Sequence, residues 1–237
     1  MTKWTAGALA LGFALWSAGA SAQTKVSIGI SGWTGFAPLV LAKEAGIFAK
    51  NGVDATIKKI PQGTRHLAIA SGDVQCAATT VETWIVWNAN GVATKQLFQL
   101  DKSYGADGIV ARNDNGMTLK DVTVVNMEPG PAAQAFLAGQ NDAAMTYEPY
   151  LSAVRDKPDA GKIIATTLDY PMVMDTFGCT PKFISENEAA VRAIVKSYYE
   201  ALDMIKTDQK KAYDIMGADV KQSGEQFGKS AGFLRWS

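Results

Sequence analysis

The sequence predicts an α/β fold made of two similar lobes, and two observations support that prediction. The first is an alternation of strand and helix patterns over residues 25–91. Residues 25–30 alternate polar and apolar side chains with β-branched residues, which is typical of a strand. A helix pattern follows, with Pro38 in its first turn and its end near Glu44. This order of elements is typical of a sheet with helical crossovers.

The second observation is a weak internal repeat. Residues 68–79 run from a short helix through Gly72 into a strand of small residues, and residues 135–146 repeat that order around Gly139. If the match is not a chance similarity, each copy forms one sheet-and-helix unit and the chain has two lobes. Ligands in such sheets bind beyond the carboxyl ends of the strands.

The other elements follow from the same kinds of pattern. We expect strands over 55–60 and 74–78, and helices over 64–70, 82–90 and 209–216. A capping box at 185–188 precedes a helix whose apolar face includes Val191, Ile194 and Tyr198. Trp84 and Trp87 lie within a helix pattern and are expected in the core. Glycines in 223–236 weaken any helix there.

Composition excludes several classes of protein. The 237 residues carry 23 Lys and Arg against 23 Asp and Glu, and 47% are hydrophobic. Such a chain can bury a core, so it is not wholly disordered. A net charge of zero gives no electrostatic footprint for nucleic acid. We expect no nucleic-acid partner.

The amino terminus has the layout of a secretory signal peptide. Lys3 supplies positive charge, residues 6–16 are apolar, and Ala20-Ser21-Ala22 is a small-residue cleavage site. We therefore expect residues 1–22 to be removed and the mature chain to be periplasmic, with an N-terminal anchor helix as the alternative reading. In an oxidising compartment Cys76 and Cys179 either pair or remain two small buried residues.

The residues that many enzymes require are missing. His66 is the single histidine, and it stands at the start of a helix pattern, away from the strand ends. A nucleophilic triad normally needs a histidine. The sequence contains no CxxC, HExxH or P-loop, so zinc, protease and nucleotide readings lack support. We expect no catalytic residue, no metal and no cofactor.

The strand-end loops gather aromatic, hydroxyl and acidic side chains. Backbone N–H groups near residues 80–82 favour an anionic group. Glu82 and Glu148 either cap their own helices or face a ligand amine. A site with both features suits a zwitterion or a neutral polar molecule. The candidate ligand-binding residues are Trp33, Thr34, Thr79, Thr80, Glu82, Tyr147, Glu148 and Asp175.

Longer stretches carry a family resemblance. Gly35-Phe36-Ala37-Pro38-Leu39, Ala42-Lys43-Glu44-Ala45-Gly46-Ile47-Phe48, Ile69-Ala70-Ser71-Gly72-Asp73 and Tyr147-Glu148-Pro149-Tyr150 occur in a characteristic order and spacing. In these the chain resembles the periplasmic substrate-binding proteins of ABC transporters, in the taurine, aliphatic sulfonate and nitrate group that includes thiamine-pyrimidine-like receptors. The resemblance covers most of the chain after the signal peptide.

The resemblance implies a two-lobed periplasmic-binding-protein type II fold. Lobe I would comprise residues 23–111 and 176–237, and lobe II residues 112–175, with crossings near 111–118 and 169–180. It also implies a small-molecule solute, an ABC permease in the inner membrane as partner, and a monomer. The loops after the first and third strands and around Tyr147 would contact the solute.

The chain departs from the family pattern in two places. Lys120 runs straight into Asp121, where roughly 40 residues of a βα unit and its loops would be expected. The chain also ends at Ser237, before the closing helices usual in the family. We therefore expect an incomplete second lobe. The alternatives are a pyrimidine-precursor synthase-like enzyme on the same fold and a truncated remnant without function.

Overall fold

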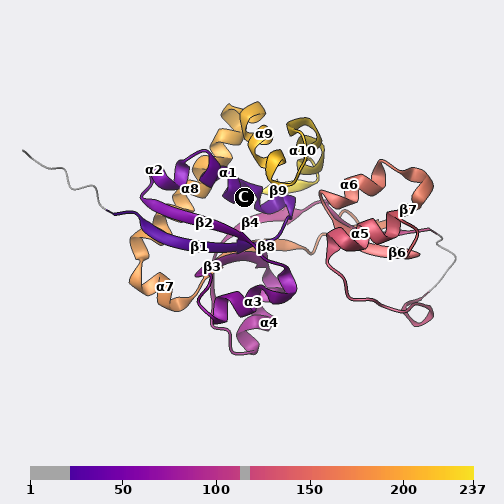
Figure 1. Cartoon of the computed structure of the whole chain (residues 1–237), viewed down its shortest axis with the longest axis horizontal. Helices are drawn as coiled ribbons and strands as arrows, with labels where there is room; N and C mark the ends of the chain where they lie inside the picture. The colour runs from indigo at the N-terminus through magenta and orange to yellow at the C-terminus, as the bar shows by residue number, and fades with distance from the viewer. Residues whose placement is uncertain (1–21, 113–117) are drawn as a thin grey trace, which may run out of the picture.

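The computed structural model describes residues 22–112 and 118–237, so the expected signal peptide and part of the expected first crossing lie outside the described residues. Two sheets separate the described chain into two lobes (Figure 1). The larger sheet has six strands in the order β2-β1-β3-β8-β4-β9, and the smaller has three in the order β6-β5-β7. The α/β, two-lobed prediction is confirmed.

The larger lobe is formed by the first and last parts of the chain. Its strands are β1 (Thr24–Ile30), β2 (Val53–Lys59), β3 (Cys76–Thr80), β4 (Lys95–Ser103), β8 (Met174–Cys179) and β9 (Leu234–Trp236). Its helical segments are η1 (Thr34–Phe36), α1 (Ala37–Glu44), α2 (Ile47–Lys50), α3 (Gln62–Ala70), α4 (Val81–Ala89), α7 (Pro181–Glu186), α8 (Glu188–Thr207), α9 (Gln209–Asp219) and α10 (Gly224–Ala231).

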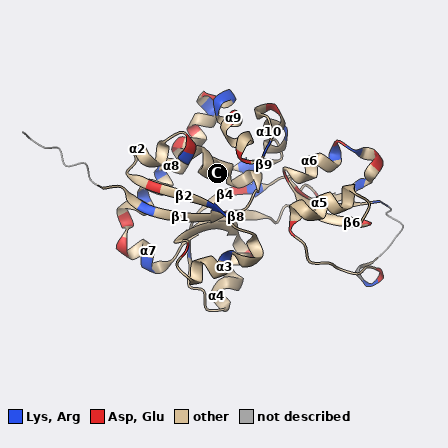
Figure 2. Cartoon of the chain, viewed as in Figure 1, with Lys and Arg blue, Asp and Glu red and all other residues tan. Residues whose placement is uncertain are grey.

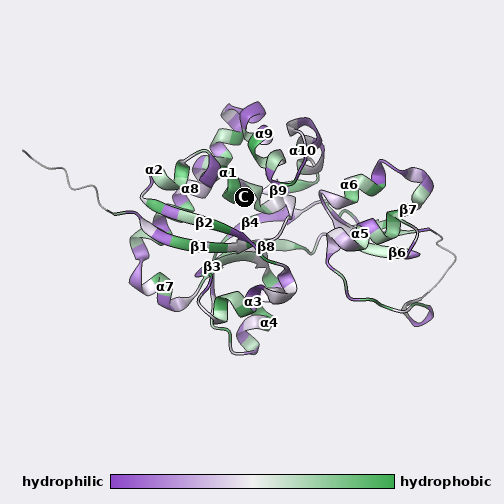
Figure 3. Cartoon of the chain, viewed as in Figure 1, coloured by the Kyte–Doolittle hydropathy of each residue, from purple (hydrophilic) through white to green (hydrophobic). Residues whose placement is uncertain are grey.

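Helices cover both faces of the larger sheet. In Figure 1 α1, α2, α8, α9 and α10 lie on one side, and α3 and α4 on the other. The small residues of β3 alternate between the two cores: Cys76 and Ala78 pack in the first, and Ala77 packs with Trp84 and Trp87 in the second. Successive strand residues point to opposite faces, which explains why the first three residues of β3 are all small and buried. In Figure 3 green hydrophobic stretches are clearest on β1 and β2.

The smaller lobe contains β5 (Asp107–Ala111), η2 (Leu119–Asp121), α5 (Pro129–Leu137), β6 (Ala143–Tyr147), α6 (Tyr150–Arg155), η3 (Pro158–Ala160) and β7 (Lys162–Thr166). Helices α5 and α6 contribute Phe136 and Leu151 to a core over one face of its sheet. On the other face Ile109, Met145 and Ile164 are exposed. That uncovered apolar face agrees with an incomplete second lobe.

The internal repeat corresponds to real structural equivalence. Gly72 after α3 and Gly139 after α5 both have a φ of 79°, in the left-handed region that glycine adopts without strain. Each glycine ends its helix, and β3 or β6 follows it. The two lobes therefore share a helix–glycine–strand unit.

The lobe boundaries differ from those expected. We expected lobe II to start at residue 112, but β5 pairs with β6 and β7 along its length. The chain changes lobes earlier, at 104–106, where Gly105 has a φ of 95°. It returns at 167–173, because β8 begins at Met174 and pairs with β3 and β4. Gly105 and Pro171 mark turns at these two places, but a turn residue does not show that the chain passes to the other lobe there.

Two helix predictions also need correction. Ser185 lies in the short helix α7, where its hydroxyl donates to the Lys182 carbonyl, and α8 begins after Asn187 instead of at a 185–188 capping box. Residues 224–231 form α10 despite their glycines. A capping box between Ser223 and Gln226 satisfies the backbone of its first turn. A cap outweighed the low helix propensity at α10, whereas the expected capping box did not form at the start of α8.

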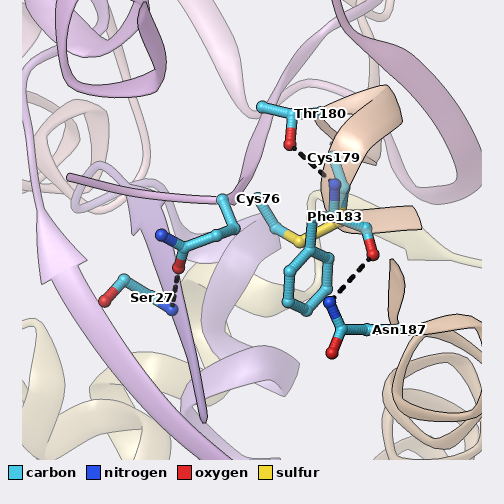
Figure 4. The surroundings of a disulfide bond; sticks show 7 residues. Ser27, Cys76, Cys179, Thr180, Phe183 and Asn187 are labelled. Atoms are coloured by element: carbon cyan, nitrogen blue, oxygen red, sulfur yellow. Dashed lines mark hydrogen bonds between the residues drawn. A yellow bond between two sulfur atoms is a disulfide. The ribbon is translucent and has the colours of Figure 1, made fainter. Parts of the chain in front are cut away.

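Cys76 and Cys179 form a disulfide, which resolves the alternative that the sequence left open (Figure 4). They are register partners on β3 and β8, with Cα atoms 3.9 Å apart and a sequence separation of 103 residues. The bond therefore fastens the returning strand β8 to the part of the larger lobe built before the crossing.

Basic and acidic residues are interspersed along the helices that the structure describes. Lys and Arg alternate with Asp and Glu over these helices (Figure 2), and several pair at helical spacing, such as Glu188 with Arg192. Within the described residues, no helix has both the length and the apolar character needed to cross a bilayer.

Candidate functional site

Two of the expected ligand residues meet where the lobes adjoin. Trp33 precedes η1 in the larger lobe, and Tyr147 ends β6 in the smaller one. Their rings pack edge to face with centroids 5.1 Å apart. Beside them the backbone N–H of Thr34 donates to the Glu148 carbonyl over 3.3 Å. The structure therefore brings these strand-end loops into contact across the two lobes.

The threonines are divided between the two faces of the larger sheet. Thr80 is the register partner of Asp175, and its hydroxyl lies 2.7 Å from that of Thr83. Thr79 faces the opposite side, because successive strand residues alternate. The hydroxyls of Thr79 and Thr34 are both buried without a hydrogen-bond partner. Of Thr79 and Thr80, only Thr80 therefore shares a face of the sheet with Asp175.

Asp175 lies opposite Asp101 on the adjacent strand. The two residues are register partners on β8 and β4, and both are almost completely buried. Burial raises the pKa of Asp101 to about 8, although a hydrogen bond from Trp33 opposes that change. Burial, and then the neighbouring Asp101, raises the pKa of Asp175 well above its usual range. Two facing carboxyl groups are unusual in a protein interior unless they have charged or hydrogen-bonding partners or a functional role.

The two glutamates have different environments. The Glu148 carboxylate is buried, accepts from the Ser152 backbone N–H over 3.1 Å, and forms an ion pair with Arg155. It thus holds the start of α6, which corresponds to the capping alternative that the sequence left open. Glu82 is exposed in the first turn of α4, near enough to Asp107 and Asp175 to raise the pKa of each.

Sequence reasoning missed three charged residues at this junction. Asp101 lies within β4, and Asp107 lies between two glycines in a stretch that the sequence indicates only as a turn. Burial raises the pKa of Asp107 to about 6. Arg65 is fully buried under β3, and burial lowers its pKa to about 10. The sequence did offer one signal for these residues. A charged side chain that interrupts an apolar stretch is rarely buried without a partner or a role, so its presence indicates a possible site.

His66 remains away from this junction. It lies on α3, with its ring 6.2 Å from that of Trp87. Two open surface hollows of about 460 and 430 Å³ also lie elsewhere, one along α9 and one beside Lys25, Asp54 and Gln75. None of the expected ligand residues lines either hollow. The junction of Trp33, Tyr147 and Asp175 is therefore the candidate site.

Part of this chain matches a known protein family. Residues 106–217 match the model of the NMT1-like family. Curated relatives from Brucella abortus, named as binding proteins, are 23% identical over 223 residues; the match covers 81% of this chain and 70% of theirs.

The fold is shared with several solved structures. The alkanesulfonate-binding protein SsuA from Xanthomonas axonopodis pv. citri superposes with a TM-score of 0.75 at 14% identity, covering 91% of this chain and 88% of that one. The periplasmic nitrate-binding protein NrtA from Synechocystis PCC 6803 gives a TM-score of 0.73 at 19% identity, covering 89% of this chain and 70% of that one. This chain therefore has the type II periplasmic-binding-protein fold, and its similarity lies with the substrate-binding proteins of the sulfonate and nitrate group.

Proposed function

We propose that this chain is the solute-binding component of an ABC importer. It would capture a small polar organic solute of the sulfonate, nitrate or thiamine-pyrimidine-like class in the periplasm and deliver it to a permease in the inner membrane. Two similar solved structures support this proposal, because they are named as alkanesulfonate-binding and nitrate-binding proteins.

The contact between Trp33 and Tyr147 carries the proposal. Each ring belongs to a different lobe, and each follows a strand end of the kind that binds ligands in open α/β sheets. Two aromatic faces on opposing lobes would enclose a flat or aliphatic solute when the lobes close. The crossings at 104–106 and 167–173 are short enough to act as hinges.

The chain acts as a binding protein and not as an enzyme under this proposal. His66 is separated from Trp33 and Tyr147, so a histidine-dependent reaction at the junction has no base there. The mature chain would work as a monomer that releases its solute to the permease. The disulfide between Cys76 and Cys179 supports export, because such bonds persist in oxidising compartments.

Ligand-induced thermal stabilisation tests the proposal. A ligand that binds only the folded chain raises its melting temperature. Protein beginning at residue 23 would be melted with taurine, ethanesulfonate, nitrate, choline and 4-aminopyrimidine. We expect at least one of these to raise the midpoint, and Trp33→Ala to remove the increase. A folded, cooperatively melting protein that responds to none of them contradicts the proposal, and a chain without a cooperative transition supports the remnant alternative.

A further inference from the structure

The carboxyl groups of Asp175 and Asp101 indicate which end of a solute the junction recognises. Asp175 is 3% exposed, and no hydrogen bond contributes to the shift of its pKa, which arises from burial and from neighbouring charges. Asp101 accepts one hydrogen bond, from the Trp33 indole, on Oδ1, while its Oδ2 is buried without a partner. Both residues have the sheet positions that face η1 and Trp33.

Both arginines near these carboxyl groups already have hydrogen-bond partners within the protein. Arg65 donates through Nε and Nη2 to the Ile60 carbonyl and through Nη1 to the Ala78 carbonyl. Arg155 forms its ion pair with Glu148 and donates to the Gly105 carbonyl over 2.9 Å. Neither guanidinium therefore has its fork turned toward a ligand anion, which is the arrangement that arginine usually supplies for sulfonate-like groups.

The ionisable side chains around the junction are mainly carboxyl groups. Asp107 and Glu82 both raise the pKa of Asp175, and Arg65 is the cation that opposes them. A bare anion placed here would meet carboxyls without a free arginine. A cationic or N–H-donating group would instead supply the partner that the Asp175 carboxyl lacks.

A metal ion does not fit the same positions. Across residues 22–112 and 118–237, no three His, Cys, Asp or Glu side chains are grouped closely enough to hold one. An organic cation needs fewer ligands, because it combines one charged nitrogen with an apolar body that aromatic rings can contact. Trp33 and Tyr147 provide those rings beside the carboxyls.

We propose, resting on the function above, that the solute carries a cationic or hydrogen-bond-donating nitrogen, and that Asp175 receives this group with Asp101 beside it. The solute is thus an organic amine or a zwitterion and not a simple anion. This distinguishes the chain from a receptor for nitrate or for an unsubstituted sulfonate. Trp33 and Tyr147 contact the remainder of the molecule.

Two matched pairs of probes test this on the unaltered protein. Taurine and ethanesulfonate share a sulfonate and differ in the ammonium group, while choline and 3,3-dimethyl-1-butanol share a shape and differ in charge. We expect at least one nitrogen-bearing member to bind, with its uncharged or amine-free counterpart bound at least about tenfold more weakly. That is the loss expected when taurine gives up a charge-assisted hydrogen bond, or choline the contact of its charge with the carboxyl groups and aromatic rings. Titration calorimetry measures both constants.

Variants then assign the group to its residue. Asp175→Asn should weaken binding of the nitrogen-bearing probe about tenfold or more, while Asp54→Asn, at an exposed position of β2, should not change it. Circular dichroism confirms that each variant is folded. If Asp175→Asn does not fold, the probe pairs decide the question without it.

The outcomes separate the two proposals. Binding of ethanesulfonate or nitrate as tightly as taurine, or binding unaffected by Asp175→Asn, overturns the amine assignment and leaves the importer function standing. No binding of any probe by folded protein overturns both.

Discussion

The indole N–H of Trp33 donates to Oδ1 of Asp101 over 3.3 Å, although 68 residues separate the two in the chain. This bond holds the Trp33 ring between β4 of the larger sheet and the Tyr147 ring of the other lobe. It also explains why Gly35 has no side chain. A Cβ there would collide with the Asp101 carboxylate and with the indole nitrogen.

Asp101→Asn should raise stability near neutral pH and flatten its dependence on pH. Burial raises the folded-state pKa of Asp101 to about 8, so the folded protein holds its proton more tightly than the unfolded chain does. That stabilisation is fully present below the unfolded pKa, is lost progressively as pH rises toward about 8, and does not return above it. Asparagine does not titrate, and it retains an acceptor for Trp33.

Thermal melts of both proteins from about pH 5 to about pH 9 check this prediction. Each unit of pKa difference corresponds to about 1.4 kcal/mol, so the gap between the two proteins should widen with pH. A gap that stays constant over this range would show that Asp101 is not held protonated.

Gly35→Ala should destabilise the fold by about 1–3 kcal/mol, because the added methyl group forces Asp101 or Trp33 to move. Gly63→Ala is the matched control. It lies in α3, where a Cβ would meet one atom of Glu128 at 3.7 Å, so alanine should be neutral or stabilising by about 0.5–1 kcal/mol. Urea denaturation measures both, and equal midpoints for the two variants would refute the collision.

Arg155→Ala should cost about 3–5 kcal/mol, because it leaves the fully buried Glu148 carboxylate without its ion-pair partner. The exposed pair Glu188–Arg192 on α8 provides the comparison. Arg192→Ala should cost less than about 0.5 kcal/mol, as expected for a solvated pair on a helix. Similar losses at the two sites would mean that Glu148 keeps enough water to need no partner.

Replacing both Cys76 and Cys179 by Ser should cost about 2–5 kcal/mol, because the bond closes a loop of 103 residues. Reductant should produce a comparable loss in the unaltered protein and none in the double variant. Chemical denaturation with and without dithiothreitol makes the comparison. An unaltered protein that is insensitive to reductant under unfolding conditions would indicate that the bond does not form.

Local patterns were enough to predict the elements of the larger lobe. Strands and helices up to residue 90 lie within a few residues of their expected bounds, since each has its own periodicity and a glycine or proline at its end. Pairing between distant segments has no such local signal. The partnership of Cys76 with Cys179 depends on β8 returning beside β3, so it appears only in the folded chain.

For the same reason, the sequence predicted only part of the contact between the lobes. Trp33 and Tyr147 follow strand ends, where ligand residues are expected, and the structure brings their rings together. Asp101 was missed because it lies within β4 and not at a strand end. Its position opposite Asp175 depends on the pairing of β4 with β8, which no local pattern shows. Glu148 follows a strand end as well, but its carboxylate contacts Ser152 and Arg155. Its position in the sequence cannot show whether the carboxylate caps a helix or faces a ligand.

Closure of the lobes around a solute is the central claim, and a distance measured across the junction tests it most directly. Spin labels at Ile85→Cys on α4 and Met145→Cys on β6 would occupy exposed positions of the two lobes. We predict that taurine or choline, whichever raises the melting temperature, shifts the distances from a broad distribution to a single narrow one. An unchanged distribution at saturating probe would contradict the account.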